Sequence, residues 1–156
     1  MRFMAIAAAC LALASATTVS VACEVKLGTR VASQVSSDFA ALVHFTKVTC
    51  APSNEAGKCT LMCVSDLNIE GANRDLALTM ITASAATHMR QAGLQKFSRI
   101  LFADRSLLLN RTALTLPASK AVELQKGFPT SKEQPLQMAA RVAAEYKQYS
   151  IDKPKQ

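Results

Sequence analysis

Cysteine placement constrains the fold of this chain more than any other feature of its sequence. After an N-terminal segment that contains Cys10, the chain keeps four cysteines: Cys23, Cys50, Cys59 and Cys63. An even number of cysteines in a small exported domain predicts a framework of disulfide bridges, which restricts the strands that can be neighbours. Disulfide bridges persist in oxidising compartments. The prediction therefore requires that the N-terminal segment directs the chain to such a compartment.

The N-terminal segment has the pattern of a secretory signal peptide. Arg2 supplies a positive charge, residues 3–14 are all apolar, and small and hydroxylated residues follow them. The apolar run is too short to span a membrane, which needs about 20 such residues. We therefore expect residues 1–22 to be removed on export, with cleavage before Cys23 or, as a second site, before Thr17.

Cleavage directly before a cysteine leaves a lipid anchor on Cys23 as an alternative. Ser20 stands where lipoprotein signals usually carry a large aliphatic residue, and Glu24 follows the cysteine. Acylation of Cys23 would also leave three cysteines, one of them unpaired. We therefore favour a periplasmic or secreted product without a lipid, and keep the lipid-anchored form as the alternative.

The charge and length of the exported chain narrow its classes of partner. Removal of residues 1–22 leaves 134 residues, and we expect one domain over 23–150 followed by a polar tail over 151–156. The remaining 17 Lys and Arg against 11 Asp and Glu give a net charge of +6. We expect no nucleic-acid partner outside the cytoplasm and no membrane span in the mature chain. The classes of partner that remain are anionic lipid headgroups, surface polysaccharides and acidic proteins. The alternative is that the positive charge only keeps the protein soluble.

The first half of the exported chain has patterns that predict one short helix and several strands. Residues 23–27 alternate apolar and charged side chains, which predicts a strand, and residues 29–39 repeat apolar side chains every four positions, which predicts a helix. Residues 40–50 and 59–69 are rich in strand-forming residues. Residues 51–58 are turn-forming, so we expect a loop there that joins the two strands into a hairpin.

The hairpin suggests a pairing of the four cysteines. With Cys50 opposite Cys59, Cys63 turns to the predominantly apolar face, and the alternation of residues 23–27 turns Cys23 to the same kind of face. We therefore predict bridges between Cys50 and Cys59 and between Cys23 and Cys63. Loop closure makes them worth about 2.7 and about 4 kcal/mol, respectively.

A metal site is the alternative use of the cysteines. It would combine Cys59 and Cys63 with Cys50 or His44. The spacing Cys-x-x-x-Cys is not the usual Cys-x-x-Cys, and an oxidising compartment favours disulfides. We therefore expect no metal and no cofactor.

A strand, a helix and a second strand follow the hairpin turn. Residues 59–69 lead to a helix after Gly71, which Asn73 would cap and Gly93 would end. A strand over residues 96–103 comes next. The helix is long enough for a crossover, so we expect the two strands to be parallel.

The last third of the chain alternates strand and helix less clearly. Residues 107–116 have strand character, residues 117–126 predict a short helix, and a last helix runs from Gln134 or Pro135 to Tyr149. Ser131 and Gln134 offer a capping box for it. The whole pattern predicts a small, disulfide-stapled α/β or α+β domain with a C-terminal helix.

Few residues have the spacing of catalytic groups. His44 and His88 lie in no motif with a nearby nucleophile or carboxylate. Asp104 would stand just past the end of a parallel strand, where open sheets place ligand sites, and Asp66 could lie near it. A small enzyme with a site built from Asp66, Asp104 and a histidine is therefore one function class.

The other class is a non-enzymatic module that binds a protein partner or an anionic envelope component, and we favour it. Its candidate contact is the densest basic segment of the chain, with Asp104 as the only acidic residue between residues 90 and 111. The basic residues are Arg90, Lys96, Arg99, Arg105 and Arg111. A patch of one charge sign favours an anionic partner.

Overall fold

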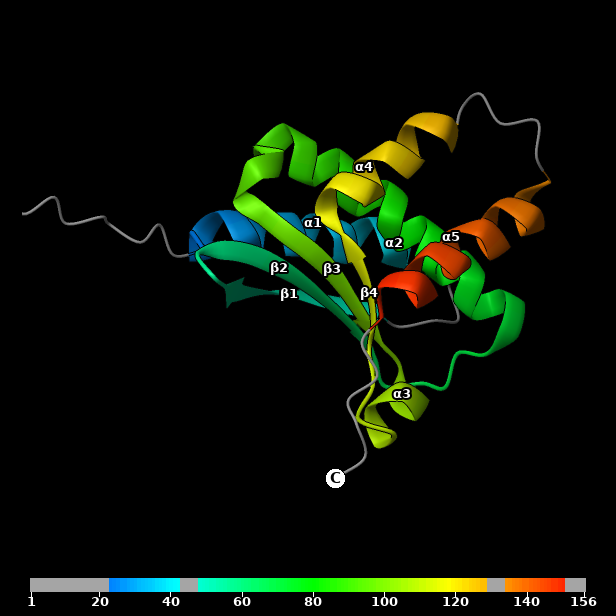
Figure 1. Ribbon diagram of the computed structural model, residues 1–156. Coiled ribbons are helices and arrows are strands. Elements are labelled where there is room, and N and C mark those ends of the chain that lie inside the picture. The colour runs from blue at the N-terminus through cyan, green and yellow to red at the C-terminus, as the bar shows by residue number, and fades with distance from the viewer. Residues whose placement is uncertain (1–22, 43–47, 129–133, 151–156) are drawn as a thin grey trace, which may run out of the picture.

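The computed structural model describes residues 23–42, 48–128 and 134–150, which form a mixed α/β fold (Figure 1). The elements in chain order are α1 (Val25–Leu42), β1 (Val48–Glu55), β2 (Lys58–Ser65), α2 (Gly71–Ala92), η1 (Leu94–Lys96), β3 (Phe97–Ala103), α3 (Arg105–Leu109), β4 (Leu114–Pro117), α4 (Ala118–Gly127) and α5 (Pro135–Tyr149). The predicted class, a small α/β domain with a hairpin and a C-terminal helix, is confirmed. The predicted signal peptide and tail lie outside the described residues.

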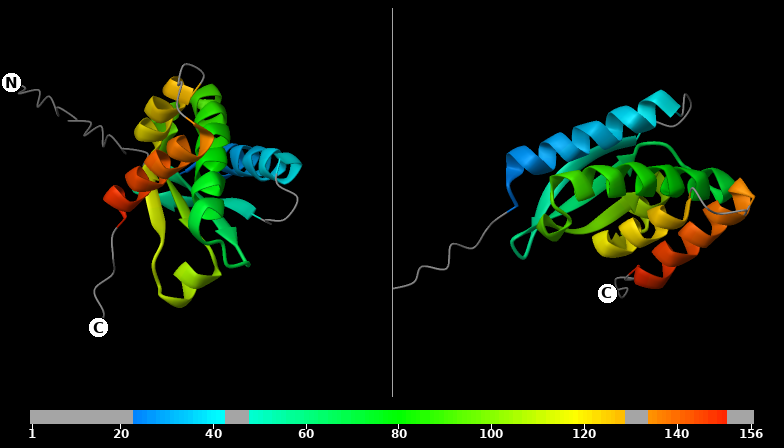
Figure 2. Two further views of the ribbon diagram at one scale, coloured as in Figure 1. Left: turned by 90° about the vertical axis from the view of Figure 1, so that its right-hand side faces the viewer. Right: turned by 90° about the horizontal axis from the view of Figure 1, so that it is seen from above.

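The four strands form one sheet in the order β1-β2-β3-β4. β1 and β2 are antiparallel, β2 and β3 are parallel, and β3 and β4 are antiparallel. The strand-helix-strand crossover through α2 is therefore confirmed. α2 lies between α1 on one side and α4 and α5 on the other (Figure 2).

Side chains alternate between a buried and an open face of this sheet. The buried face packs against the longer helices and carries Val48, Cys50, Leu61, Cys63, Ile100, Phe102 and Leu116. On the other face, Ala51 and Met62 are exposed and Leu101 is half-buried. The core thus lies between one face of the sheet and the helices.

The predicted strand over residues 23–27 is wrong, because α1 begins at Val25. Three alternating apolar residues are too few to distinguish a strand from a helix end. Leu27 also continues the four-residue spacing of Val31 and Val35, which are both buried. Val25, in contrast, is 71% exposed. The helical period therefore holds from the start of α1.

The predicted hairpin is present, but its register and its loop differ from the prediction. Cys50 lies opposite Cys63 rather than Cys59, a shift of four residues. The strands continue through most of the expected loop to a two-residue turn at Ala56 and Gly57, whose φ angles of 49° and 80° suit a tight hairpin. An even shift keeps every side chain on its face, so Cys63 still points into the core.

Both disulfides differ from the predicted pairing, although all four cysteines are bridged. Cys23 is bonded to Cys59, and Cys50 to Cys63. The second bridge joins directly opposed residues of β1 and β2. The first fastens the start of the described chain to the start of β2, and it occupies the sulfur that a lipid anchor on Cys23 would need.

Edge strand β1 is covered by α1 rather than left open. The main-chain N–H of Cys50 donates to the hydroxyl of Ser36 at 2.8 Å, so it points away from β2. Pro52, two residues further along, has no N–H to satisfy on this outer edge. The proline inside the predicted loop is therefore compatible with an edge strand.

The remaining expectations are met in part. The helices α2, α4 and α5 and strand β3 follow the predicted ranges, and Gly93 ends α2 with a φ of 105°. Asn73 lies inside α2, whose N-cap is Glu70, so its predicted capping role is wrong. Residues 107–116 hold the short helix α3 and the four-residue strand β4 instead of one strand. Ser131 lies outside the described residues.

Candidate functional site

Asp104 follows directly on β3, at the end of the parallel strand pair where the sequence places it. Its side chain is fully buried. Oδ1 accepts a hydrogen bond from the main-chain N–H of Leu107 at 2.9 Å, which makes Asp104 the N-cap of α3. The carboxylate therefore fixes the start of this short helix.

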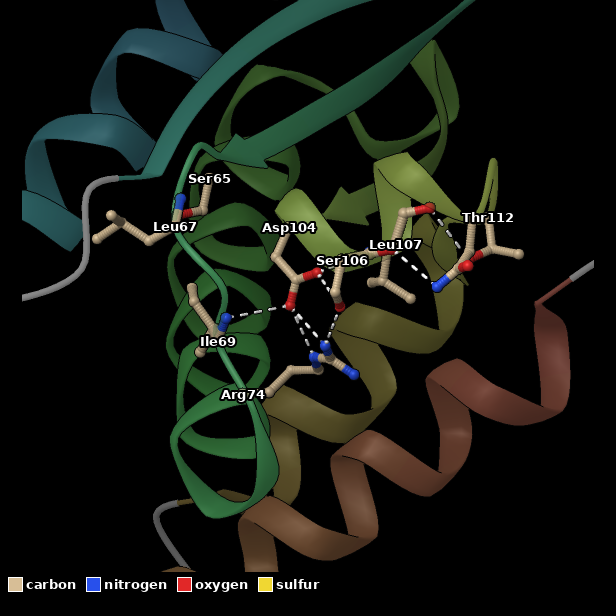
Figure 3. Close-up of polar contacts among 9 residues, drawn as sticks. Ser65, Leu67, Ile69, Arg74, Asp104, Ser106, Leu107 and Thr112 are labelled. Carbon is tan, nitrogen blue, oxygen red and sulfur yellow. Dashed lines mark hydrogen bonds and ion pairs between the residues drawn. The ribbon is translucent and has the colours of Figure 1, made fainter.

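A set of donors converges on the Asp104 carboxylate (Figure 3). Arg74 donates to Oδ2 through Nε at 3.0 Å and through Nη2 at 2.6 Å. The N–H of Ile69 donates to the same oxygen at 3.3 Å, and the hydroxyl of Ser106 donates to Oδ1 at 2.9 Å. These contacts hold the β2–α2 connection, the first turn of α2 and the start of α3 together.

The same donors set the charge of Asp104. Burial alone would raise the pKa of its carboxyl group, but the hydrogen bonds from Leu107, Arg74 and Ser106 together hold that pKa below its ordinary value. An ionised carboxylate has about four acceptor positions, and the five donor contacts occupy them. Asp104 is therefore a structural anchor in this arrangement, with no lone pair left to act as a general base.

Among the described residues, the predicted catalytic side chains are not assembled into one site around Asp104. Asp66 is exposed in the connection after β2, and His44 lies outside the described residues. His88 lies 14 positions after Arg74 on α2, which places it about 21 Å away along the helix axis. His88 and the Asp104 carboxylate thus lie at opposite ends of α2.

His88 belongs to a second polar cluster, between α1 and α2. Its Nε2 lies 2.8 Å from Oδ2 of Asp38, and the hydroxyl of Ser84 donates to the same oxygen at 2.8 Å. The hydrogen bond to His88 is the main cause of the lowered pKa of Asp38. Ser84 and His88 both form their hydrogen bond with the same oxygen of Asp38 rather than with each other. They are therefore not arranged as a nucleophile and its base. The cluster connects the two helices.

The residues of the basic segment predicted as a contact do not lie at one place in the fold. Lys96 precedes β3 and Arg105 follows it, so about 23 Å of strand separates them. Arg90 is exposed in the last turn of α2. Arg99, in the middle of β3, donates through Nε to Glu55 at 2.8 Å. Only Arg105 and Arg111 flank one surface feature, the helix α3.

We define the α3 tip as residues 105–111. Figure 1 shows α3 beyond the ends of β3 and β4. Leu108 is 51% exposed and Leu109 is 77% exposed, whereas Leu107 is half-buried. Arg105 and Arg111 are exposed on either side of them. The chain therefore places two adjacent leucines in solvent between two arginines.

The sequence predicts Arg105 and Arg111 as contact residues but misses the helix and the exposed leucines between them, because it treats these leucines as part of a strand. The signal that could have revealed the helix is Asp104, a good N-cap residue three positions before Leu107. Leu67, the other exposed leucine of this end, points away from α3 (Figure 3), although its carbonyl accepts from the N–H of Arg105.

Comparisons with known proteins add no relative. No family model, curated protein or solved structure matches this chain. Within the three described ranges, no group of three or more His, Cys, Asp or Glu is placed to hold a metal ion. No helix of those ranges is long and apolar enough to cross a membrane.

Proposed function

We propose that this protein is an exported, non-enzymatic module that binds an anionic component of the cell envelope through the α3 tip. The observation that carries the proposal is the exposure of Leu108 and Leu109 between the exposed Arg105 and Arg111. Large apolar side chains grouped in solvent are typical of contact sites. The flanking arginines favour a partner of negative charge.

The base of the α3 tip supports a contact role because it is rigidly held. Asp104 caps α3 and is itself fixed by Arg74 and by the N–H of Ile69. Arg74 also donates to Ser106 at 3.0 Å, inside α3. A surface that is fixed before binding loses little conformational entropy on contact. A five-residue helix alone would not keep its shape in water.

The backbone at Arg111 gives a second argument. Its φ is 53°, in the left-handed region where glycine is the usual residue after a helix. An arginine there costs roughly 1 kcal/mol more than glycine. A strained position that keeps a long cationic side chain points to a use for that side chain.

Export is the third element of the proposal. Two disulfides and the signal-like N-terminal segment both favour an oxidising compartment outside the cytoplasm. The net charge of +6 expected after signal removal would attract anionic envelope material there. We prefer this proposal to an enzyme because Asp104 is saturated with donors and His88 lies at the other end of α2.

Sedimentation with an envelope fraction tests the proposal. The mature protein should co-sediment, and retention should fall between about 0.1 and about 1 M salt, where the Debye length falls from about 10 to about 3 Å. Arg105→Ser with Arg111→Ser should release the protein. The matched control, Arg90→Ser with Lys96→Ser, removes the same charge from the other end of β3 and should release less. Equal release by both pairs would contradict a role for the α3 tip.

A further inference from the structure

We infer that the anionic component is a lipid bilayer, and that Leu108 and Leu109 enter its interface while Arg105 and Arg111 contact the headgroups. This inference rests on the proposed function and names its partner. Arg105, Leu108 and Leu109 stand at positions i, i+3 and i+4 of α3, so they share one side of the helix. The side that carries the leucines therefore also carries a cation.

The size and shape of the α3 tip favour lipid over a protein partner. A stable protein interface buries about 800 Å² on each side. The α3 tip projects from the end of the sheet and has one helix of five residues (Figure 1). A bilayer needs no complementary groove, because it accepts apolar side chains at any point of its interface. Two leucines on a projection suit that partner.

The leucines also distinguish lipid from an anionic polysaccharide. A polysaccharide would bind Arg105 and Arg111 through its charges and leave Leu108 and Leu109 in water. In a bilayer the apolar side chains enter the boundary between headgroups and acyl chains, about 5–10 Å deep. Arginine side chains extend their charge towards the headgroups while their stems stay among apolar groups. The bilayer thus uses all four exposed side chains.

Charge along the chain is compatible with an anionic membrane. Between residues 104 and 118 the one acidic residue is Asp104, which is buried and paired with Arg74. Each arginine near such a surface contributes about a fivefold increase in binding. The β2–α2 connection at this end carries two exposed carboxylates, Asp66 and Glu70. Both belong to a different segment from the α3 tip, the one whose Leu67 points away from α3 (Figure 3).

The chain offers a direct probe because it contains no tryptophan. We would introduce one by Leu109→Trp and follow its fluorescence with vesicles of phosphatidylcholine, with or without phosphatidylglycerol. The emission should shift to the blue with the anionic vesicles and change little with the neutral ones. The matched control is Met62→Trp, at a residue that is 39% exposed on the open face of the sheet. Its emission should not shift.

Binding measurements then separate the roles of the side chains. Leu108→Ser with Leu109→Ser should weaken vesicle binding at least about tenfold, because the apolar contribution is lost. Arg105→Ser with Arg111→Ser should weaken it about 30-fold. Both pairs replace exposed side chains, so circular dichroism and the thermal midpoint should stay unchanged. A leucine pair that binds vesicles as well as the wild type would overturn the inference.

The two experiments also distinguish a failure of the lipid inference from a failure of the proposed function. Retention on the envelope fraction that depends on Arg105 and Arg111, without a blue shift of Leu109→Trp on anionic vesicles, would reject lipid and leave a polysaccharide or an acidic protein. Failure in both experiments would reject the proposed function as well. A blue shift in both tryptophan variants would mean that the protein does not bind through the α3 tip.

Discussion

The guanidinium Nη2 of Arg74 lies 2.6 Å from Oδ2 of Asp104, although the two residues are 30 positions apart in the chain. The carboxylate is fully buried, and the arginine is 23% exposed. This ion pair connects the first turn of α2 to the start of α3. It therefore holds the surface that we propose as the contact site in place from inside the fold.

Arg74→Ala should destabilise the protein by about 3 kcal/mol, because it leaves the Asp104 carboxylate buried without its cation. Urea unfolding followed by circular dichroism measures this change as a lower midpoint. Arg105→Ala is the control, since its exposed side chain should change stability by less than about 0.5 kcal/mol. Similar midpoints for the two variants would show that the ion pair contributes little.

Asp104 should also give the protein an acid-sensitive stability. The pKa of its carboxyl group is held below the ordinary value of 3.8 in the fold, so the fold binds fewer protons than the unfolded chain near that pH. The stabilisation is complete above about pH 5 and is lost as pH falls through 3.8 towards the folded-state pKa. Asp104→Asn should lower the unfolding free energy at neutral pH and flatten its decline on acidification.

Unfolding curves between neutral pH and about pH 3 test this linkage. Asp38 and Glu55 also have lowered pKa values, so the Asp104→Asn protein should keep part of the acid sensitivity. The difference in unfolding free energy between the wild type and the Asp104→Asn protein should therefore shrink as pH falls. A constant difference across the range would place the acid sensitivity elsewhere.

The disulfide pairing gives a third prediction. Non-reducing peptide mapping should find Cys23 joined to Cys59 and Cys50 joined to Cys63. The sequence separations of 36 and 13 correspond to about 3.8 and about 2.9 kcal/mol of loop-closure stabilisation. Cys23→Ser with Cys59→Ser should therefore cost more stability than Cys50→Ser with Cys63→Ser. Peptides that join Cys50 to Cys59 would contradict the register of the hairpin.

The sequence predicts those elements whose signal is local. α2 has regular apolar spacing and ends at Gly93, and β3 is an apolar run after Lys96, so both are recognised from neighbouring residues. The register of the hairpin is not local in this sense. Residues 51–58 hold many turn-forming residues, and nothing in them marks Ala56 and Gly57 as the turn that is used. The predicted cysteine pairing depends on the predicted register, so the four-residue difference in register makes both predicted bridges wrong.

In the candidate site, too, the sequence predicts only what depends on neighbouring residues. The position of Asp104 after a parallel strand could be predicted, because it depends on one strand end. Its partner Arg74 could not, since their contact depends on how the first turn of α2 packs against the end of β3. The residues of the basic segment do not lie together, because the extended strand β3 separates Lys96 from Arg105. Closeness in sequence is not closeness in space along a strand.

Close packing of α1 against β1 gives the last prediction. A Cβ atom added to Gly28 would lie 2.6 Å from Cβ of Pro52 and 3.3 Å from the sulfurs of Cys23 and Cys59. These neighbours belong to a proline ring and a disulfide, so they have little freedom to move aside. In an open helix, Gly→Ala would stabilise by about 1 kcal/mol.

We therefore expect Gly28→Ala to destabilise the protein by about 1–3 kcal/mol, because the overlap outweighs the gain in helix propensity. The control is Gly127→Ala at the end of α4, where an added Cβ meets no atom within 4 Å among the described residues. That variant should be unchanged or more stable by up to about 1 kcal/mol. Thermal unfolding of both variants decides the sign. A Gly28→Ala protein as stable as the wild type would mean that α1 does not approach β1 as closely as Gly28 and Pro52 indicate.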